Sequence, residues 1–269
     1  MAILDSRDLV DTAAAVSALV DVLYAQPTAP PSLYVDLEGI NLSRYGSISI
    51  LQIYVRPLDQ AYLVDIHTLG RTAFCTPGGA YTASAGRTLR DLLEDEAVAK
   101  VFFDVRNDSD ALYSHFGVRL EGVVDLQLME LATRPAPAVR PRNVFVSGLA
   151  KCIERDGVLA PAERVAWAAA KDRGRRLFAP ELGGTYSVFN QRPLTEEVWL
   201  YSVQDVRFLP RLWALYDARL RRKPGWEHKV RDAARDRVAQ SQTPSFDGKG
   251  RHMALPPDGR SECNSEVVG

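Results

Sequence analysis

Short apolar runs occupy residues 32–66, and amphipathic stretches dominate the later part of the chain. Residues 32–38, 47–55 and 61–66 are rich in β-branched and aromatic residues and are separated by short loops that contain Gly46, Pro57 and Asp59. Strands joined this closely pair as antiparallel neighbours. A fourth apolar run at 100–105 predicts another strand, and residues 118–125 predict a short strand or a turn.

Helical spacing dominates the rest of the chain. The N-terminal stretch 5–24 has apolar residues at helical intervals, with Asp5 or Ser6 as a cap. Thr195 fits the N-cap of a long helix that Pro210 should kink. This long helix is expected to cover 195–222, and further helices are expected at 88–98, 107–117, 125–134, 146–157, 160–174 and 225–240. Residues 241–269 are rich in Ser, Pro and Gly and are expected to be loosely ordered.

This order of elements predicts an α/β fold. We expect a mixed β-sheet, antiparallel in its first three strands and flanked by helices. The expected organisation is an N-terminal helix and linker at 1–31 packed on the core, a main domain at 32–218, and a basic helix with a tail at 219–269.

Composition narrows the class without naming a function. Of the 269 residues, 46% are hydrophobic and 25% are charged, and the net charge is −1, so total charge gives no evidence for or against a polyanionic partner. No apolar run approaches the roughly 20 residues that span a bilayer, and the N-terminus lacks the pattern of a secretory signal. Three widely spaced cysteines argue against a disulfide framework or a zinc cluster. We therefore expect an intracellular protein of the cytoplasm or nucleus that does not engage a membrane.

The candidate chemistry lies in acids that are far apart in the chain. Asp36 and Glu38 are two residues apart on a strand, so they project from one face. Asp108 opens a helix after a strand, with Asp104 and Asp110 as competitors, and Tyr201 and Asp205 are one helical turn apart. Taken singly, each has an ordinary explanation: a solvated strand end, a helix cap or the rim of a core.

Taken together, the acids predict a metal site. Four carboxylates suit two hard divalent cations, Mg²⁺ or Mn²⁺, which prefer oxygen ligands. Such a pair stabilises both the attacking and the leaving oxygen of a phosphoryl displacement, and the hydroxyl of Tyr201 would orient the water.

The same residues resemble the three motifs of the DEDDy branch of the DnaQ-like 3′–5′ exonucleases, which have the ribonuclease-H-like fold. The first motif is similar to "VDLEG", the second to "KVFFDVRNDSDAL" and the third to "YSVQDVRFL". "RPLTEEVWLYSVQDV" resembles ribonuclease D, and "DVRNDSDALYSHFGVRL" resembles the Egalitarian-like exonuclease-domain group. We do not expect the C-terminal helicase-and-RNase-D domain that accompanies ribonuclease D.

The resemblance implies roles for individual residues. Asp36, Glu38, Asp108 and Asp205 would be metal ligands, Asp36 would bridge both ions, and Glu38 and Tyr201 would hold the attacking water. Asp108 would act largely through water or the second ion, and Asn107 suits a supporting hydrogen bond. The products would be 5′-mononucleotides. Two alternatives stay open: a catalytically weak RNA-binding adaptor of the Egalitarian-like type, and a DNA exonuclease in repair.

The expected partner is single-stranded nucleic acid, with RNA favoured over DNA; a protein partner or a homodimer is also possible. Residues 219–237 hold eight Lys or Arg and three acids, which fits either phosphate contacts or an ion-paired, solvated helix. Candidate contacts near the first motif and before the third are Asn41, Leu42, Tyr45, Lys171 and Arg192.

Overall fold

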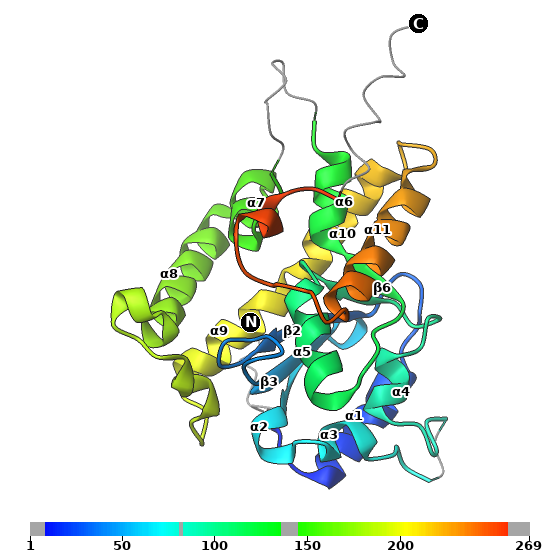
Figure 1. Ribbon diagram of the computed structural model, residues 1–269, viewed down its shortest axis with the longest axis vertical. Coiled ribbons are helices and arrows are strands. Elements are labelled where there is room, and N and C mark those ends of the chain that lie inside the picture. The colour runs from blue at the N-terminus through cyan, green and yellow to red at the C-terminus, as the bar shows by residue number, and fades with distance from the viewer. Residues whose placement is uncertain (1–8, 81–82, 136–144, 258–269) are drawn as a thin grey trace, which may run out of the picture.

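The computed structural model describes residues 9–80, 83–135 and 145–257, and it centres on a mixed sheet of six strands (Figure 1). The strand order is β1-β4-β3-β2-β5-β6. β2, β3 and β4 pair as antiparallel neighbours, whereas β1–β4, β2–β5 and β5–β6 are parallel. The expected mixed sheet, antiparallel in its first three long strands, is confirmed. The strands are β1 Leu9–Val10, β2 Leu33–Glu38, β3 Ile50–Val55, β4 Gln60–Asp65, β5 Lys100–Phe102 and β6 Val123–Asp125.

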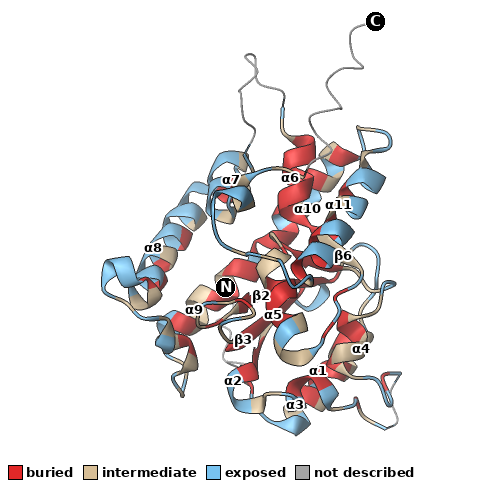
Figure 2. Ribbon diagram, viewed as in Figure 1, coloured by how far each residue is buried: buried red, intermediate tan, exposed pale blue. Residues whose placement is uncertain are grey.

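Helices cover both faces of this sheet. The side chains of Val35 and Leu37 enter a core with α1, α4 and α5, whereas Tyr34 enters a second core on the opposite face with α6 and α10. Figure 2 shows the sheet and the central helices buried, while α8 is largely exposed. The helices are α1 Ala13–Tyr24, α2 Ile66–Leu69, α3 Thr72–Cys75, α4 Leu89–Leu93, α5 Arg106–Phe116, α6 Leu126–Thr133, α7 Leu149–Asp156, α8 Pro161–Phe178, α9 Glu196–Arg207, α10 Leu209–Leu220 and α11 Trp226–Ser241, with 3₁₀ turns such as Tyr186–Asn190 (η3) and Arg251–Ala254 (η4).

Local capping explains most helix boundaries. The Thr195 hydroxyl accepts the Val198 N–H at 3.3 Å and starts α9, and Gly117 ends α5 with a left-handed φ of 68°. The predicted long helix is two helices, because the chain turns at Phe208 and Pro210 lies in the first turn of α10. The helix expected at 88–98 is shorter in the structure. α4 begins behind a capping box formed by Thr88 and Asp91, and it ends at Leu93.

Both ends of the chain differ from the sequence prediction. Residues Leu9–Val10 form an edge strand parallel to β4, and the helix begins only at Ala13 behind an N-cap at Thr12. Asp5 and Ser6, the predicted caps, lie outside the described residues. Residues 242–257, predicted to be loosely ordered, run back over the molecule with defined hydrogen bonds and the turn η4.

The three predicted segments share their hydrophobic cores. Val16 and Leu19 of α1 pack in the same cluster as β2, and Val238 of α11 belongs to that cluster too. The boundaries at 31 and 218 remain a prediction. In the described part of the chain no helix is long and apolar enough to cross a bilayer.

Candidate active site

Asp36 and Glu38 occupy the C-terminal end of β2, the central strand of the sheet. Both are half-buried, and they alternate with Leu37, which packs in the hydrophobic core. The side chains therefore emerge on the face that α9 covers, where β2 and α9 are in contact. The C-terminal end of β2 is packed against α9, so a solvated strand end does not describe the environment of these two acids.

Asp205 reaches the same place from α9. One carboxylate oxygen each from Asp36, Glu38 and Asp205 lies within 4.8 Å of the others. Asp205 is buried, with 5% of its surface exposed, and Tyr201 precedes it by one helical turn on the same face of the helix. The structure thus brings together residues 36, 38 and 205, which are far apart in the sequence.

Asp108 lies at the edge of this group, in the first turn of α5. It is 5% exposed, and its pKa is raised well above the ordinary value by burial and then by the negative charge of Asp36. Its carboxylate is not in the set of three that lie within 4.8 Å of one another. The role of Asp108 through water or the second ion stays a prediction. We call Asp36, Glu38, Asp108 and Asp205 the acid cluster.

The competing acid Asp110 is committed to a different partner. Its carboxylate accepts the backbone N–H of Arg44 at 2.8 Å and the Arg44 Nε–H at 2.7 Å, and it is 1% exposed. Asp104 is likewise bound by Arg106 through two contacts of 2.6 Å. These contacts leave Asp108 as the acid of this segment that faces Asp36.

Like charges dominate the acid cluster. Burial, followed by the charge of Asp205, raises the pKa of Asp36 to about 8. Burial and Asp36 raise the pKa of Glu38 well above its ordinary value. The Lys171 ammonium offsets part of this charge through an ion pair with Asp205. It also lowers the pKa values of Asp36 and Glu38, but by less than burial and the neighbouring acids raise them. The cluster is therefore short of positive charge.

This donor set fits divalent cations. All candidate ligands are carboxylate oxygens, which Mg²⁺ and Mn²⁺ prefer to nitrogen or sulfur, and their excess negative charge is what a cation would neutralise.

The ring of Tyr201 is packed on several sides. The Lys171 ammonium lies 3.9 Å from its centroid, and the Phe178 ring meets it edge-on at 5.0 Å. Gly174 of α8 allows this approach, because a Cβ there would be 2.8 Å from both Cβ and Cγ of Tyr201. The sequence predicts a helix that ends at Gly174, but α8 continues through it to Phe178.

The predicted nucleic-acid contacts fall into two groups. Tyr45, beside the first motif, is 86% exposed. Asn41 is exposed and has a left-handed backbone conformation with φ 48°. Leu42 is partly buried and packs against the hydrophobic core. Arg192 instead pairs with Asp65 and donates to the carbonyls of Phe189 and Gln191 at 2.8 and 2.7 Å. Lys171, as described above, faces Asp205. The contacts of Arg192 and Lys171 inside the protein leave less of each cation for a ligand.

Much of the basic stretch 219–237 is ion-paired. Arg221 pairs with Asp217 and Arg235 with Glu96, while Arg237 is 4% exposed and binds Asp125 at 2.7 Å. These contacts support the ion-paired reading of this stretch for the arginines concerned.

Sequence reasoning missed Arg44 and Arg237. Arg44 connects the loop after β2 to α5 and to the end of α11, and Arg237 holds Asp104 and Asp125. Their hydrogen-bond partners lie 66 to 200 positions away in the chain, so no local spacing indicates them.

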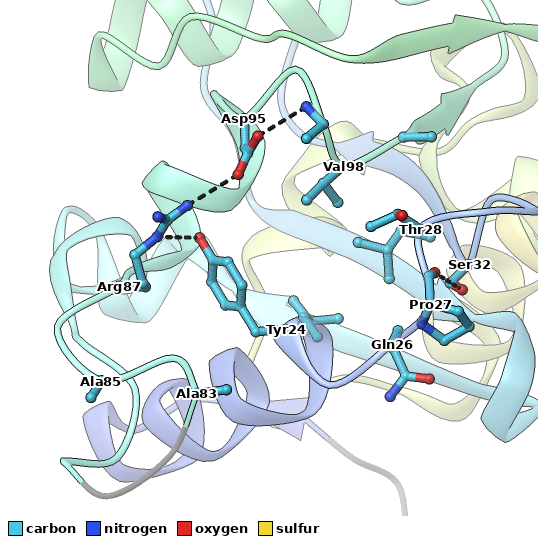
Figure 3. A pocket seen from close by; sticks show the side chains of 14 residues that line it. Tyr24, Gln26, Pro27, Thr28, Ser32, Ala83, Ala85, Arg87, Asp95 and Val98 are labelled. Atoms are coloured by element: carbon cyan, nitrogen blue, oxygen red, sulfur yellow. Dashed lines mark hydrogen bonds and ion pairs between the residues drawn. The ribbon is translucent and has the colours of Figure 1, made fainter.

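A hollow of ≈ 500 Å³ opens at the other end of β2 (Figure 3). It is lined by the end of α1, by Ser32 and Leu33, and by Arg87, which donates to Tyr24 at 3.2 Å and to Asp95 at 3.0 Å. Leu33 and Glu38 are the two ends of the strand, roughly 16 Å apart at the rise of a β-strand. The hollow is therefore separate from the acid cluster.

The six-stranded mixed sheet covered by helices is the ribonuclease-H-like fold, and a cluster of carboxylates at its centre is typical of metal-dependent nucleases. Residues 8–151, more than half of the chain, match the family model described as 3′–5′ exonuclease. The chain therefore belongs to the 3′–5′ exonuclease family. Tyr201 and Asp205 lie beyond the matched residues.

Relatives agree with this assignment. RNase D of Trypanosoma brucei, solved in complex with RNA U12, is similar with a TM-score of 0.65 at 22% identity, over 93% of this chain and 75% of that chain. Escherichia coli RNase D, described as an exoribonuclease involved in structured RNA processing, gives 0.61 at 17% identity, over 88% and 51% of the two chains. At these identities the likeness shows the fold alone. The piRNA biogenesis protein EXD1 of Mus musculus is 33% identical over 99 residues, which are 37% of this chain and only 15% of EXD1.

Proposed function

We propose that the chain removes 5′-mononucleotides from the 3′ end of single-stranded RNA, supported by two divalent cations, Mg²⁺ or Mn²⁺. The observation that carries this proposal is the convergence of Asp36, Glu38 and Asp205 within 4.8 Å, with Asp108 beside them. Carboxylates this close repel one another strongly unless protons or cations neutralise them.

Asp36 is the central acid of the proposed site. The charge of Asp205 raises its pKa, and its own charge raises the pKa values of Glu38 and Asp108. A carboxylate that interacts with the three others is the one best placed to be shared between two cations. When bound, the cations would stabilise charge on the attacking and leaving oxygens of the phosphodiester.

Tyr201 and Glu38 would hold the attacking water. Burial and the charge of Asp205 raise the pKa of Tyr201, so its hydroxyl stays protonated and is able to donate a hydrogen bond. We assign Tyr201 an orienting role, because a phenol this hard to deprotonate is a poor base. Glu38, charged once the cluster is neutralised, would accept a hydrogen bond from the same water.

RNA is proposed over DNA on the strength of the neighbours. RNase D of T. brucei was solved with RNA, and RNase D of E. coli is described as an exoribonuclease. Both likenesses concern the fold, so the substrate must be tested directly.

The test uses one single-stranded sequence, as RNA and as DNA, labelled at the 5′ or the 3′ end, with Mn²⁺ or Mg²⁺. A 3′–5′ exonuclease gives a ladder of shortening 5′-labelled strands and releases the 3′ label at once as a mononucleotide. Asp108→Ala should abolish both, and Asp172→Ala, which removes an exposed acid of α8 paired with Arg176, should not. If the wild type and Asp108→Ala are equally inert but bind RNA, the chain is an adaptor and the catalytic proposal is wrong.

A further inference from the structure

The segment after α11 returns to the start of α5, the helix that carries Asp108. We call residues 242–257 the C-terminal strap; in Figure 1 it is the red segment that leaves α11 and turns through η4. Its start is fixed by Arg44, which donates to the carbonyls of Ser241 and Thr243 at 2.8 Å each and of Pro244 at 3.1 Å. The Phe246 ring lies 5.8 Å from the same guanidinium. Arg44 therefore ties the strap to the loop that follows the first motif.

The middle of the strap is seated on α5 next to Asp108. Gly248 lies against the side chain of Asn107, and a Cβ at this position would collide with Asn107 Oδ1. That oxygen is buried and has no hydrogen-bond partner among the described residues. Further along, Arg106 donates to the Met253 carbonyl at 2.8 Å and Val146 N–H to the Ala254 carbonyl at 2.9 Å. The strap is thus anchored on both sides of residues 249–252.

These anchored residues carry exposed positive charge. Lys249 and Arg251 are exposed, and neither side chain has a hydrogen bond or ion pair with any described residue. His252 is engaged differently, since its Nε2 lies 2.8 Å from the Asp247 carbonyl. Lys171 and Arg192, the cations that the sequence favoured, are both paired with acids inside the protein.

We propose that the C-terminal strap binds the sugar-phosphate backbone of the substrate strand through Lys249 and Arg251, beside the acid cluster. The inference rests on the proposed function, since it assumes a strand whose 3′ end lies at Asp36. A cluster of acids repels a polyanion, and fixed cations next to it lower that barrier and hold the strand. Because such contacts release counterions, they contribute a salt-dependent part of the affinity that is independent of base sequence.

The first experiment reverses the charge without moving the strap. Lys249→Glu/Arg251→Glu is compared with Arg71→Glu/Arg164→Glu, which makes the same charge change at two exposed arginines away from the strap, beside α3 and on α8. Both pairs are made in an Asp108→Asn background, and binding of a 5′-fluorescein 12-nucleotide RNA is measured by anisotropy at several salt concentrations. We expect the strap pair to raise Kd about tenfold and to reduce the salt slope by about 1.4, at 0.7 per phosphate contact on a single strand. Equal Kd values and slopes for the two pairs would overturn the proposal.

The second experiment moves the strap without changing its charge. Gly248→Ala should push the strap off Asn107 and raise Kd for the same RNA, with the melting temperature as a check on folding. In the otherwise wild-type enzyme, Gly248→Ala should raise KM more than it lowers kcat. If Gly248→Ala or the charge reversal instead speeds turnover, the strap is an inhibitory cover and the inference is wrong.

Failure of the proposed function looks different. The anisotropy assay needs no cleavage, so an inert wild-type chain whose RNA binding still depends on Lys249 and Arg251 would refute the exonuclease mechanism and keep the strap as a binding surface.

Discussion

Two groups of carboxylates lie beside α5, and only one of them is neutralised by arginines of the protein. In the acid cluster, burial and mutual repulsion raise the pKa values of Asp36, Glu38 and Asp108. In the second group, Asp104 and Asp125 are held by Arg237, which is 4% exposed and lies 3.5 and 2.7 Å from them. Burial would raise the pKa of Asp104, but hydrogen bonds from Arg106 and the charge of Arg237 outweigh it, so that pKa is lowered.

The two groups differ in how much positive charge the side chains of the protein bring to them. The second group carries its own cations, so it is complete when the chain folds and joins α5, β6 and α11. The acid cluster has Lys171 on Asp205 and otherwise only repulsion among its acids. A buried arginine neutralises the second group, whereas the neighbouring acid cluster keeps an excess of negative charge. The acid cluster is therefore suited to bind cations from solution.

The largest expected effect is on the completed group. Arg237→Ala leaves Asp125 buried without its counter-charge and should lower the free energy of unfolding by about 3–5 kcal/mol. Arg235→Ala, two residues away, breaks only exposed pairs with Glu96 and Asp232 and should cost less than about 1 kcal/mol. Urea unfolding of both variants measures the contrast; equal losses would mean that Arg237 is not the cation that completes this group.

An intermediate effect is expected from divalent cations. Because only the folded chain gathers the acids, Mg²⁺ or Mn²⁺ at about 100 times its Kd should stabilise the protein by about 2.7 kcal/mol, and EDTA should remove the gain. Thermal scans with and without the metal measure the shift. Arg235→Ala should keep the shift and Asp205→Asn should lose most of it; a full shift in Asp205→Asn would place the cations elsewhere.

The smallest expected effect is a gain in stability from removing a buried charge. The pKa of Asp36 is raised on folding, so the folded chain holds the proton more tightly, and metal-free stability should fall as pH rises from about 4 to about 8. Asp36→Asn should therefore stabilise the protein in EDTA at pH 8 by about 1–2 kcal/mol and flatten this pH dependence.

The matched change in the other group should have the opposite sign. Asp125→Asn removes a paired charge and should destabilise the protein, in the same urea titrations at pH 8. If Asp36→Asn also destabilises the metal-free chain, the acid cluster is not under the electrostatic strain described here.

Local patterns in the sequence determined much of the fold. Alternation placed Asp36 and Glu38 on one face of β2, the helical turn from Tyr201 to Asp205 placed both on one face of α9, and Thr195 marked where that helix begins. These features depend on residues that are close together in the sequence, so a single sequence is enough to predict them. The sequence did not predict the edge strand Leu9–Val10. This strand is only two residues long and forms by pairing with β4, so it shows no alternation of apolar and polar residues.

Only the tertiary structure decided which charges meet. The chain by itself supplied the acids of the candidate site and favoured Asp108. It could not show that Arg44, 66 positions away, binds Asp110, or that the same arginine fixes Thr243 and Pro244 across 199 and 200 positions. Likewise the sequence could not show that Lys171 and Arg192 would face acids within the protein. Spacing encodes which side of a helix or strand a residue takes, whereas the partner it meets there is set by how distant elements pack.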